Sequence, residues 1–179
     1  MTRVALSIGA NLGDRLAALQ YAVDTLAEAG TVVAVSDVYE TDPVGGPEQP
    51  EYYNAVVVLL TDVPPLGVLA TAHRAEQGKG RTREVRWGPR TLDVDVLAYG
   101  QEVRADPVLT LPHPRALERA FVLVPWAAVD PGFRLPDGRT VAEVAATVPA
   151  NGIRRVGPLL RMVEQRPPPA CACCTPSQC

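Results

Sequence analysis

Cysteine is absent from the first 170 residues of this 179-residue chain. All four cysteines follow a proline run at 167–169, and they are Cys171, Cys173, Cys174 and Cys179. A zinc site needs four well-spaced ligands, and the only histidines, His73 and His113, lie far upstream of these thiols. We therefore expect one domain over residues 1–164 that folds around an apolar core, and a flexible, exposed tail over residues 165–179.

Long hydrophobic runs are also missing. No apolar stretch approaches the roughly 18 residues that a membrane-spanning helix needs. The N-terminus lacks a charged segment followed by the apolar core of a signal peptide. The sequence therefore predicts a cytoplasmic protein that has no membrane partner.

Positive charge is not in excess, and phosphate-binding glycine loops are lacking. The net charge is −3, with 47% hydrophobic and 21% charged residues, which indicates a globular chain and excludes a general nucleic-acid binder. There is no Walker-type loop, and residues 9–13 have too few glycines for a dinucleotide fingerprint. No internal repeat is present. A nucleotide site in this chain would therefore not be a glycine-rich phosphate-binding loop.

Hydrophobic periodicity predicts strands and helices in alternation. The apolar run Val4–Ile8 is typical of a strand that Gly9 closes, and Asp14 can cap a helix that begins at Arg15 and stops at Gly30. Residues 31–39 and 52–61 predict two further strands. The segment 41–51 between them has three prolines and two glycines, which indicates a loop.

The second half of this pattern completes a known arrangement. Pro64 and Pro65 open a second helix that should run to about Gln77, and residues 92–99 predict a fourth strand. The order βαββαβ is the split-βαβ arrangement, in which two helices cover one face of an antiparallel sheet. The sequence thus predicts the α+β class. Shorter helical segments are expected at 116–120, 127–129 and 141–147.

Two aspartates interrupt the fourth predicted strand. Alternation sends Leu92, Val94 and Val96 to one face and Asp93 and Asp95 to the other, about 7 Å apart along the strand. Paired carboxylates are oxygen ligands suited to Mg²⁺, which takes one or two of them and completes its shell with water and phosphate. The alternative is a solvated strand face, because Asp-x-Asp is a short motif.

An arginine cluster comes just before these acids. Its members are Arg81, Arg83, Arg86 and Arg90, interrupted by Trp87-Gly88-Pro89. Arginine matches phosphate oxygens bidentately, so arginines beside metal-binding carboxylates favour polyphosphate transfer. Trp87 could equally anchor the loop to the core. Glycines at 78 and 80 indicate a mobile loop that closes over ATP as a lid.

A second polar and aromatic cluster flanks the proline-rich loop. Tyr52 and Asn54 share a strand face, where an amide beside an aromatic ring could bind a planar heterocycle. Ordinary surface polarity at a strand edge is the alternative. Phe121 could simply be a core residue. His113 between two prolines is a structural turn residue or a contact to phosphate.

These segments, taken together, resemble the pterin pyrophosphokinases of folate synthesis. The resemblance runs in order through SIGANLGDR, TDPVGGPEQPEYYNAV, GRTREVRWGPRTLDVDVL and LTLPHPRALERAFVL, from about Val4 to Val129. It implies a ferredoxin-like core in a three-layer α/β/α fold. It also implies transfer of a diphosphoryl group from Mg·ATP to 6-hydroxymethyl-7,8-dihydropterin, with AMP as the second product.

The same resemblance assigns roles to individual residues. Two Mg²⁺ ions would bind Asp93 and Asp95, and Arg81 and Arg90 would be the catalytic arginines. The implied ATP contacts are Glu76, Arg83, Trp87, Arg90, Thr110, His113 and Arg119. The implied pterin contacts are Thr41, Pro43, Val44, Tyr52, Asn54 and Phe121. The expected partners are small molecules, and the expected state is a monomer.

The chain departs from the family pattern in two places. The stretch between Gly80 and Trp87 is one residue shorter, so the roles of Arg81 and Arg83 depend on the alignment register. Val108 stands where some members place an arginine toward ATP, and nothing after Pro158 has a recognised counterpart. Two other functions stay open from the residues alone: a different Mg-nucleotide transferase, and a ligand-binding or interaction domain whose acids are merely solvated.

Overall fold

The computed structural model describes residues 1–42, 50–79 and 91–159. Its strands are β1 (Thr2–Ala10), β2 (Thr31–Val35), β3 (Asp37–Thr41), β4 (Tyr52–Thr61), β5 (Asp93–Tyr99), β6 (Arg104–Ala105), β7 (Thr110–Leu111) and β8 (Ile153–Pro158). Its helices are α1 (Arg15–Leu26), α2 (Pro65–Gly78), α3 (Ala120–Val129) and α4 (Val141–Ala145), with one 3₁₀ turn, η1 (Ala116–Glu118). No helix within these ranges has the length and apolar character to cross a membrane.

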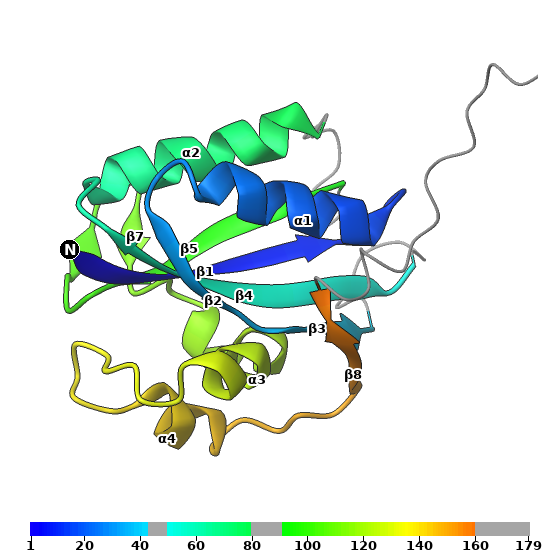
Figure 1. The fold of residues 1–179 in the computed structure, drawn as a ribbon. Coiled ribbons are helices and arrows are strands. Elements are labelled where there is room, and N and C mark those ends of the chain that lie inside the picture. The colour runs from blue at the N-terminus through cyan, green and yellow to red at the C-terminus, as the bar shows by residue number, and fades with distance from the viewer. Residues whose placement is uncertain (43–49, 80–90, 160–179) are drawn as a thin grey trace, which may run out of the picture.

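The strands form an antiparallel sheet between two helical layers. Its order is β5-β1-β4-β3-β8, and β2 pairs with β4 beside this path. Figure 1 shows α1 and α2 on one face of the sheet, and α3 and α4 on the other. The predicted α+β class with an α/β/α arrangement and an antiparallel sheet is confirmed.

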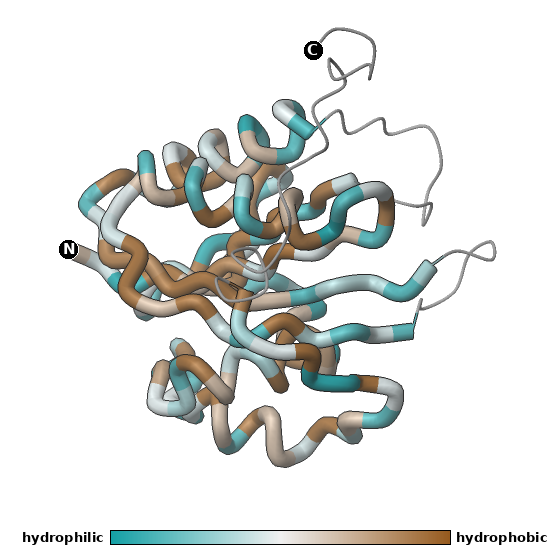
Figure 2. The backbone as a smooth tube through the Cα atoms, turned by 45° about the vertical axis from the view of Figure 1, so that its right-hand side comes forward, coloured by the Kyte–Doolittle hydropathy of each residue, from teal (hydrophilic) through white to brown (hydrophobic). Residues whose placement is uncertain are grey.

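Strand alternation divides the core into two clusters. On β1, Val4, Leu6 and Ile8 pack toward α1 and α2, whereas Ala5 packs toward α3 and α4. Trp126 of α3 is fully buried in the second cluster. The hydrophobic segments in Figure 2 accordingly run along the central strands. Because both faces of the sheet are covered, its central strands are apolar on both sides.

The first helix begins where the sequence predicts. The side chain of Asp14 accepts a hydrogen bond from the Ala17 backbone nitrogen at 2.9 Å and caps α1. The helix ends at Leu26, before the predicted stop at Gly30. The second helix, α2, begins at Pro65 and ends at Gly78, within one residue of the predicted end.

Two predicted elements differ from the structure, and strand β8 adds a third difference. The expected strand over 31–39 is two strands, because Ser36 interrupts it and its hydroxyl accepts a hydrogen bond from the Val56 nitrogen at 2.9 Å. The short turn expected at 127–129 is the end of the ten-residue helix α3, which contains Pro125. Strand β8 was not predicted, because its largely exposed residues lack an apolar alternation.

Several predicted features lie outside the described residues. They are most of the loop over 41–51, the arginine-rich lid over 80–90 and the tail over 165–179. Gly78 is described, and it belongs to α2 rather than to a loop. A Cβ atom at Gly78 would lie 2.1 Å from the Tyr21 hydroxyl, so close packing of α1 on α2 is the reason for glycine here.

Candidate active site

The two predicted metal ligands lie on β5, at the edge of the described sheet. Asp93 and Asp95 are half-buried and alternate with the buried Val94 and Val96. The valines belong to the core beneath α1 and α2, so the carboxylates project from the opposite face, on which α3 packs. The predicted division of this strand into an acidic face and an apolar face is therefore confirmed.

Polar and small residues continue across this face onto neighbouring strands. Asp93 pairs with Gly9 of β1, which in turn pairs with Asn54 of β4. Asp95 pairs with Ser7 in the next row. Directly paired residues share a face, and strands lie about 4.8 Å apart, so the Cα atoms of Asn54 and Asp93 are about 10 Å apart across Gly9. On β1 the α3-side core ends at Ala5, and on β4 it ends at Val56; we call the face beyond these residues the polar floor.

Gly9 keeps this floor open. A Cβ atom at this position would lie 2.8 Å from Oδ1 of Asn54. That separation is shorter than van der Waals contact, so any larger residue would displace the amide. The sequence had suggested that Gly9 closes the strand, but β1 continues to Ala10, and an isolated glycine within a strand indicates close approach of another group.

A hydrogen bond orients the amide of Asn54. Its Nδ2 donates to the Thr41 hydroxyl at 2.7 Å, and both residues are buried, with exposed fractions of 5% each. This bond turns Oδ1 toward Gly9, where it can accept a hydrogen bond from a bound ring. Tyr52 lies on the same strand face, opposite Thr41. The structure therefore brings together three of the residues predicted to contact the pterin.

A cavity of about 280 Å³ opens beside the acidic strand. Glu76, Asp95, Thr110 and His113 line it, together with His73, exposed Val108 and neighbouring apolar residues. Glu76 is only 4% exposed, and its Oε1 accepts a hydrogen bond from the Val94 backbone nitrogen at 3.1 Å. Four side chains that the resemblance assigned to ATP or metal thus share one cavity.

The surroundings of His113 favour the neutral imidazole. Burial lowers its pKa below the ordinary 6.5, the carboxylates of Asp95 and Asp93 oppose this shift, and Arg119 and Arg115 reinforce it. Its Nδ1 accepts a hydrogen bond from the Arg115 backbone nitrogen at 3.3 Å, which leaves the proton on Nε2. His113 can therefore donate a hydrogen bond to a phosphate oxygen without being charged.

Phe121 and Arg119 come from the start of α3. The guanidinium carbon of Arg119 lies 5.6 Å from the centre of the Phe121 ring. Phe121 is partly buried at the border of the α3-side core. This position is compatible with both predicted roles of its ring, core packing and stacking on the pterin. Its location on this layer places it on the same side of the sheet as Asn54.

The acidic pair fits a magnesium ion by its chemistry. Within the described ranges, no group of three or more His, Cys, Asp or Glu side chains is placed to hold a metal. Two carboxylates on one strand face are what Mg²⁺ takes when phosphate and water supply the remaining ligands. The other predicted site residues, Pro43, Val44, Arg81, Arg83, Trp87 and Arg90, lie outside the described residues.

Comparison with known proteins identifies the family. The family model described as 7,8-dihydro-6-hydroxymethylpterin-pyrophosphokinase (HPPK) matches residues 5–131. A 2-amino-4-hydroxy-6-hydroxymethyldihydropteridine pyrophosphokinase from Pseudomonas aeruginosa is 41% identical over 156 residues, which cover 86% of this chain and 96% of the relative. Its counterpart from Mycobacterium leprae is 45% identical over 185 residues, covering 93% and 95%.

Solved structures support the fold. The HPPK-DHPS protein crystallised in complex with substrates matches with a TM-score of 0.63 at 11% identity, over 86% of this chain and 46% of that chain. Wild-type HPPK-DHPS from Plasmodium falciparum matches with a TM-score of 0.60 at 14% identity, over 81% and 44%. The chain thus spans less than half the length of these larger proteins. On the sequence match over residues 5–131, this chain belongs to the 7,8-dihydro-6-hydroxymethylpterin-pyrophosphokinase family.

Proposed function

We propose that this chain transfers a diphosphoryl group from ATP to 6-hydroxymethyl-7,8-dihydropterin. The hydroxymethyl oxygen of the pterin attacks the β-phosphorus of ATP. A bond forms between that oxygen and the β-phosphorus, the bond from the β-phosphorus to the oxygen bridging it to the α-phosphorus breaks, and the hydroxyl proton is released. The products are the pterin diphosphate and AMP.

The pterin would lie on the polar floor between β4 and α3. Asn54, oriented by Thr41, reads the edge of the ring with Oδ1, and Tyr52 and Phe121 supply aromatic surface. Pro43 and Val44 are proposed to complete the contacts through their backbone. In this position the substrate hydroxyl would point across Gly9 toward the acidic strand, which would orient the nucleophile before reaction.

ATP would occupy the cavity between α2, β5 and β7. In the described part of the chain, the proposed contacts are Glu76, Thr110 and His113 of the cavity and Arg119 at the start of α3. Arg83, Trp87 and Arg90 are proposed as further contacts. Arg81 and Arg90 are proposed to offset the charge that develops on the transferred group. His113 would donate a hydrogen bond from Nε2–H to a phosphate oxygen.

Asp93 and Asp95 would hold two Mg²⁺ ions. The bound ions would neutralise the phosphate oxygens and orient ATP for in-line attack. The two carboxylates would fix the position of the magnesium charge on the sheet face that also carries the proposed pterin contacts. Because one copy of the chain carries every described residue assigned here, we also propose that a monomer is active.

One observation carries this proposal: the row Asn54, Gly9, Asp93 joins the pterin residues to the metal ligands on one sheet face. Chromatography of the nucleotides after incubation with Mg·ATP and the pterin alcohol tests it. We expect AMP and pterin diphosphate in equal amounts. Stoichiometric ADP with a pterin monophosphate would refute diphosphoryl transfer.

A further inference from the structure

Four charged side chains form a network on the reverse face of the strands that carry the pterin residues. We call Arg15, Glu40, Asp42 and Arg154 the root network. Glu40 is at its centre: its Oε1 lies 3.6 Å from Nη1 of Arg15, and its Oε2 lies 3.4 Å from Nε of Arg154. Arg15 comes from α1, Glu40 from β3 and Arg154 from β8, and Asp42 follows β3 directly; these elements are far apart in the sequence.

The root network reaches both strand ends that flank residues 43–49. Arg154 also donates to Oδ1 of Asp42 at 3.4 Å, just after β3 ends. Arg15 donates through Nη1 to the Glu51 carbonyl at 2.9 Å, just before β4 begins. The chain leaving β3 and the chain entering β4 are therefore tied to the same carboxylate, Glu40.

Two further contacts hold the β4 end. The guanidinium of Arg15 stacks on the Tyr53 ring, with its central carbon 3.7 Å from the ring centre. Nδ2 of Asn11, a residue only 2% exposed, donates to the Pro50 carbonyl at 3.2 Å. The start of β4 is thus fixed against the beginning of α1.

The network is partly desolvated at its centre. The side chains of Arg15 and Glu40 are 25% and 27% exposed, whereas those of Arg154 and Asp42 are 51% and 63% exposed. Screening by solvent weakens exposed ion pairs, so the Arg15–Glu40 pair contributes more than the outer pair. Glu40 is the residue whose loss separates both ends at once.

The network lies behind the proposed pterin contacts rather than among them. Glu40 pairs with Tyr53 and with Arg154 across its two neighbouring strands, so all three share one face. Alternation sends Thr41 and Asn54 to the other face. Glu40 and Asp42 are the two chain neighbours of Thr41, whose hydroxyl orients the amide of Asn54.

From this arrangement we infer that Arg15, Glu40 and Arg154 are positioning residues for the pterin substrate. They hold β3 and β4 in the register that keeps Thr41, Tyr52 and Asn54 in place, and they set pterin affinity without touching the ligand. The inference deepens the proposed function and rests on it. It also gives β8 a role, because Arg154 comes from this strand.

The charge of the pterin makes the inference testable. The pterin alcohol is neutral at neutral pH, so a distant charge changes its affinity little by Coulomb attraction. Glu40→Gln removes a negative charge, and Arg154→Gln removes a positive one. A field effect on the anion ATP would shift its KM in opposite directions for these two variants, whereas loss of positioning raises the pterin KM in both.

The experiment measures pterin KM and ATP KM for the wild type, Glu40→Gln, Arg154→Gln and the double variant. Arg155→Gln is the matched control, because Arg155 is the next residue of β8 and its side chain forms an ion pair with Asp37, at the other end of β3. We expect pterin KM to rise about fivefold for Glu40→Gln and about threefold for Arg154→Gln, because partly exposed ion pairs are individually weak. The double variant should be no worse than Glu40→Gln alone.

Direct binding provides a second measurement. Calorimetric titration of the pterin alcohol in the presence of a non-hydrolysable ATP analogue should show the same weakening of affinity. Raising NaCl should increase the pterin KM of the wild type and leave that of Glu40→Gln nearly unchanged. The wild-type series needs no variant, so a wild-type pterin KM that does not change with NaCl would contradict the positioning role even if Glu40→Gln folds poorly.

The outcomes separate the two proposals. A wild type that forms no AMP and no pterin diphosphate overturns the proposed function and this inference with it. An active wild type whose pterin KM is unchanged in both variants overturns only the positioning role. Equal effects of Arg154→Gln and Arg155→Gln would also overturn it, because they would indicate a general weakening of the β3–β8 pairing.

Discussion

The Glu76 carboxylate of α2 accepts a hydrogen bond from the backbone nitrogen of Val94, the residue between the two acidic positions of β5. Because β5 is an edge strand of the described sheet, this bond supplies a partner for a backbone donor at the sheet edge. Helix α2 therefore fixes the position of β5 along the sheet edge, and β5 carries Asp93 and Asp95. A residue that we propose to contact ATP thus also supports the strand of the proposed metal ligands.

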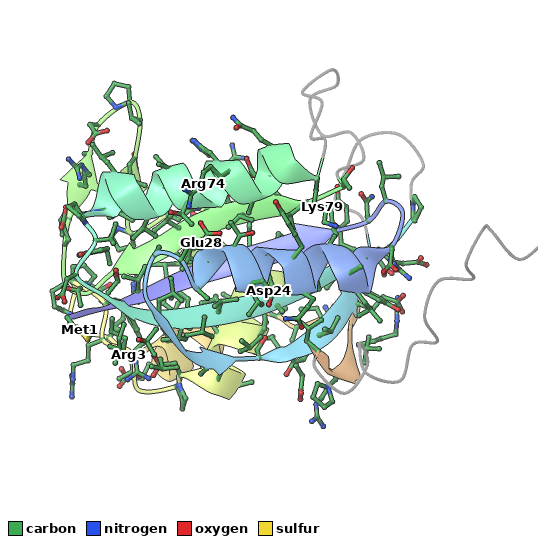
Figure 3. All side chains as sticks on the ribbon, turned by 45° about the horizontal axis from the view of Figure 1, so that its top comes forward. Met1, Arg3, Asp24, Glu28, Arg74 and Lys79 are labelled. Carbon is green, nitrogen blue, oxygen red and sulfur yellow. The ribbon has the colours of Figure 1, made fainter. Side chains whose placement is uncertain are left out.

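Glu76→Ala should destabilise the protein. A buried donor would lose its partner, which costs about 1–3 kcal/mol, and the melting temperature should fall by several degrees. Glu76→Gln keeps an acceptor oxygen and should melt near the wild type. The control is Glu28→Ala, which breaks an exposed ion pair between Glu28, just after α1, and Arg74 of α2; both residues are labelled in Figure 3. Equal melting temperatures for Glu76→Ala and the wild type would contradict the structural role.

Asp93→Ala and Asp95→Ala should each lower turnover by more than about 100-fold, the upper range for residues that only support a metal ligand. Stability should hold or rise, because removing one of two neighbouring carboxylates relieves repulsion. Turnover measured across a Mg²⁺ titration checks this. A variant that keeps near-normal turnover at limiting Mg²⁺ would remove the metal assignment.

Gly9→Ala should weaken pterin binding with little effect on ATP. The new methyl group would lie 2.8 Å from Oδ1 of Asn54 and push the amide out of position. We expect pterin KM to rise about tenfold, which corresponds to roughly 1.4 kcal/mol. Gly132→Ala is the matched control, since a Cβ atom there meets nothing within 4 Å. Similar pterin KM values for the two variants would show that the floor tolerates a methyl group.

His113 should make the free protein less stable in mild acid. The pKa of His113 in the folded state lies below the 6.5 expected for the unfolded chain. At a pH between the folded and unfolded pKa values, the unfolded chain therefore binds more protons than the folded one. The stability that this residue contributes is complete above the unfolded pKa and is lost as the pH falls toward the folded pKa. Unfolding free energies from pH 8 to pH 5, without Mg²⁺ and ATP, should fall less steeply for His113→Gln. A steeper fall in the variant would contradict the direction of the shift.

Truncation after Arg166 should leave activity and melting temperature unchanged. The removed segment contains the proline run at 167–169 and all four cysteines, and it carries no residue that we assign to either substrate. Steady-state kinetics under reducing conditions, beside the full chain, check this. Loss of activity on truncation would give the tail a role in the reaction and move the domain boundary beyond residue 164.

The sequence by itself determined the main elements and the chemical types at the site. Asp14, Pro65 and the alternation from Asp93 to Val96 act locally, through capping, fixed backbone angles and the two-residue period of a strand. These effects depend only on neighbours in the chain, so α1, α2, β4 and the acidic face of β5 could be predicted. The prediction was weakest where a local signal misled, as at Gly9, and at 127–129, which is the end of the longer helix α3.

Only the tertiary structure decided which distant residues meet. Asn54 and Asp93 share a row because β1 lies between their strands with Gly9 at the crossing, and pairing register cannot be read from either segment alone. Glu40 joins Arg15 to Arg154 because β8 returns to the edge of β3, although weak, exposed residues form that strand. Local patterns fix side-chain direction, whereas long-range strand pairing fixes which side chains become neighbours. That pairing places the residues proposed to bind the pterin and those proposed to bind the metal on one face.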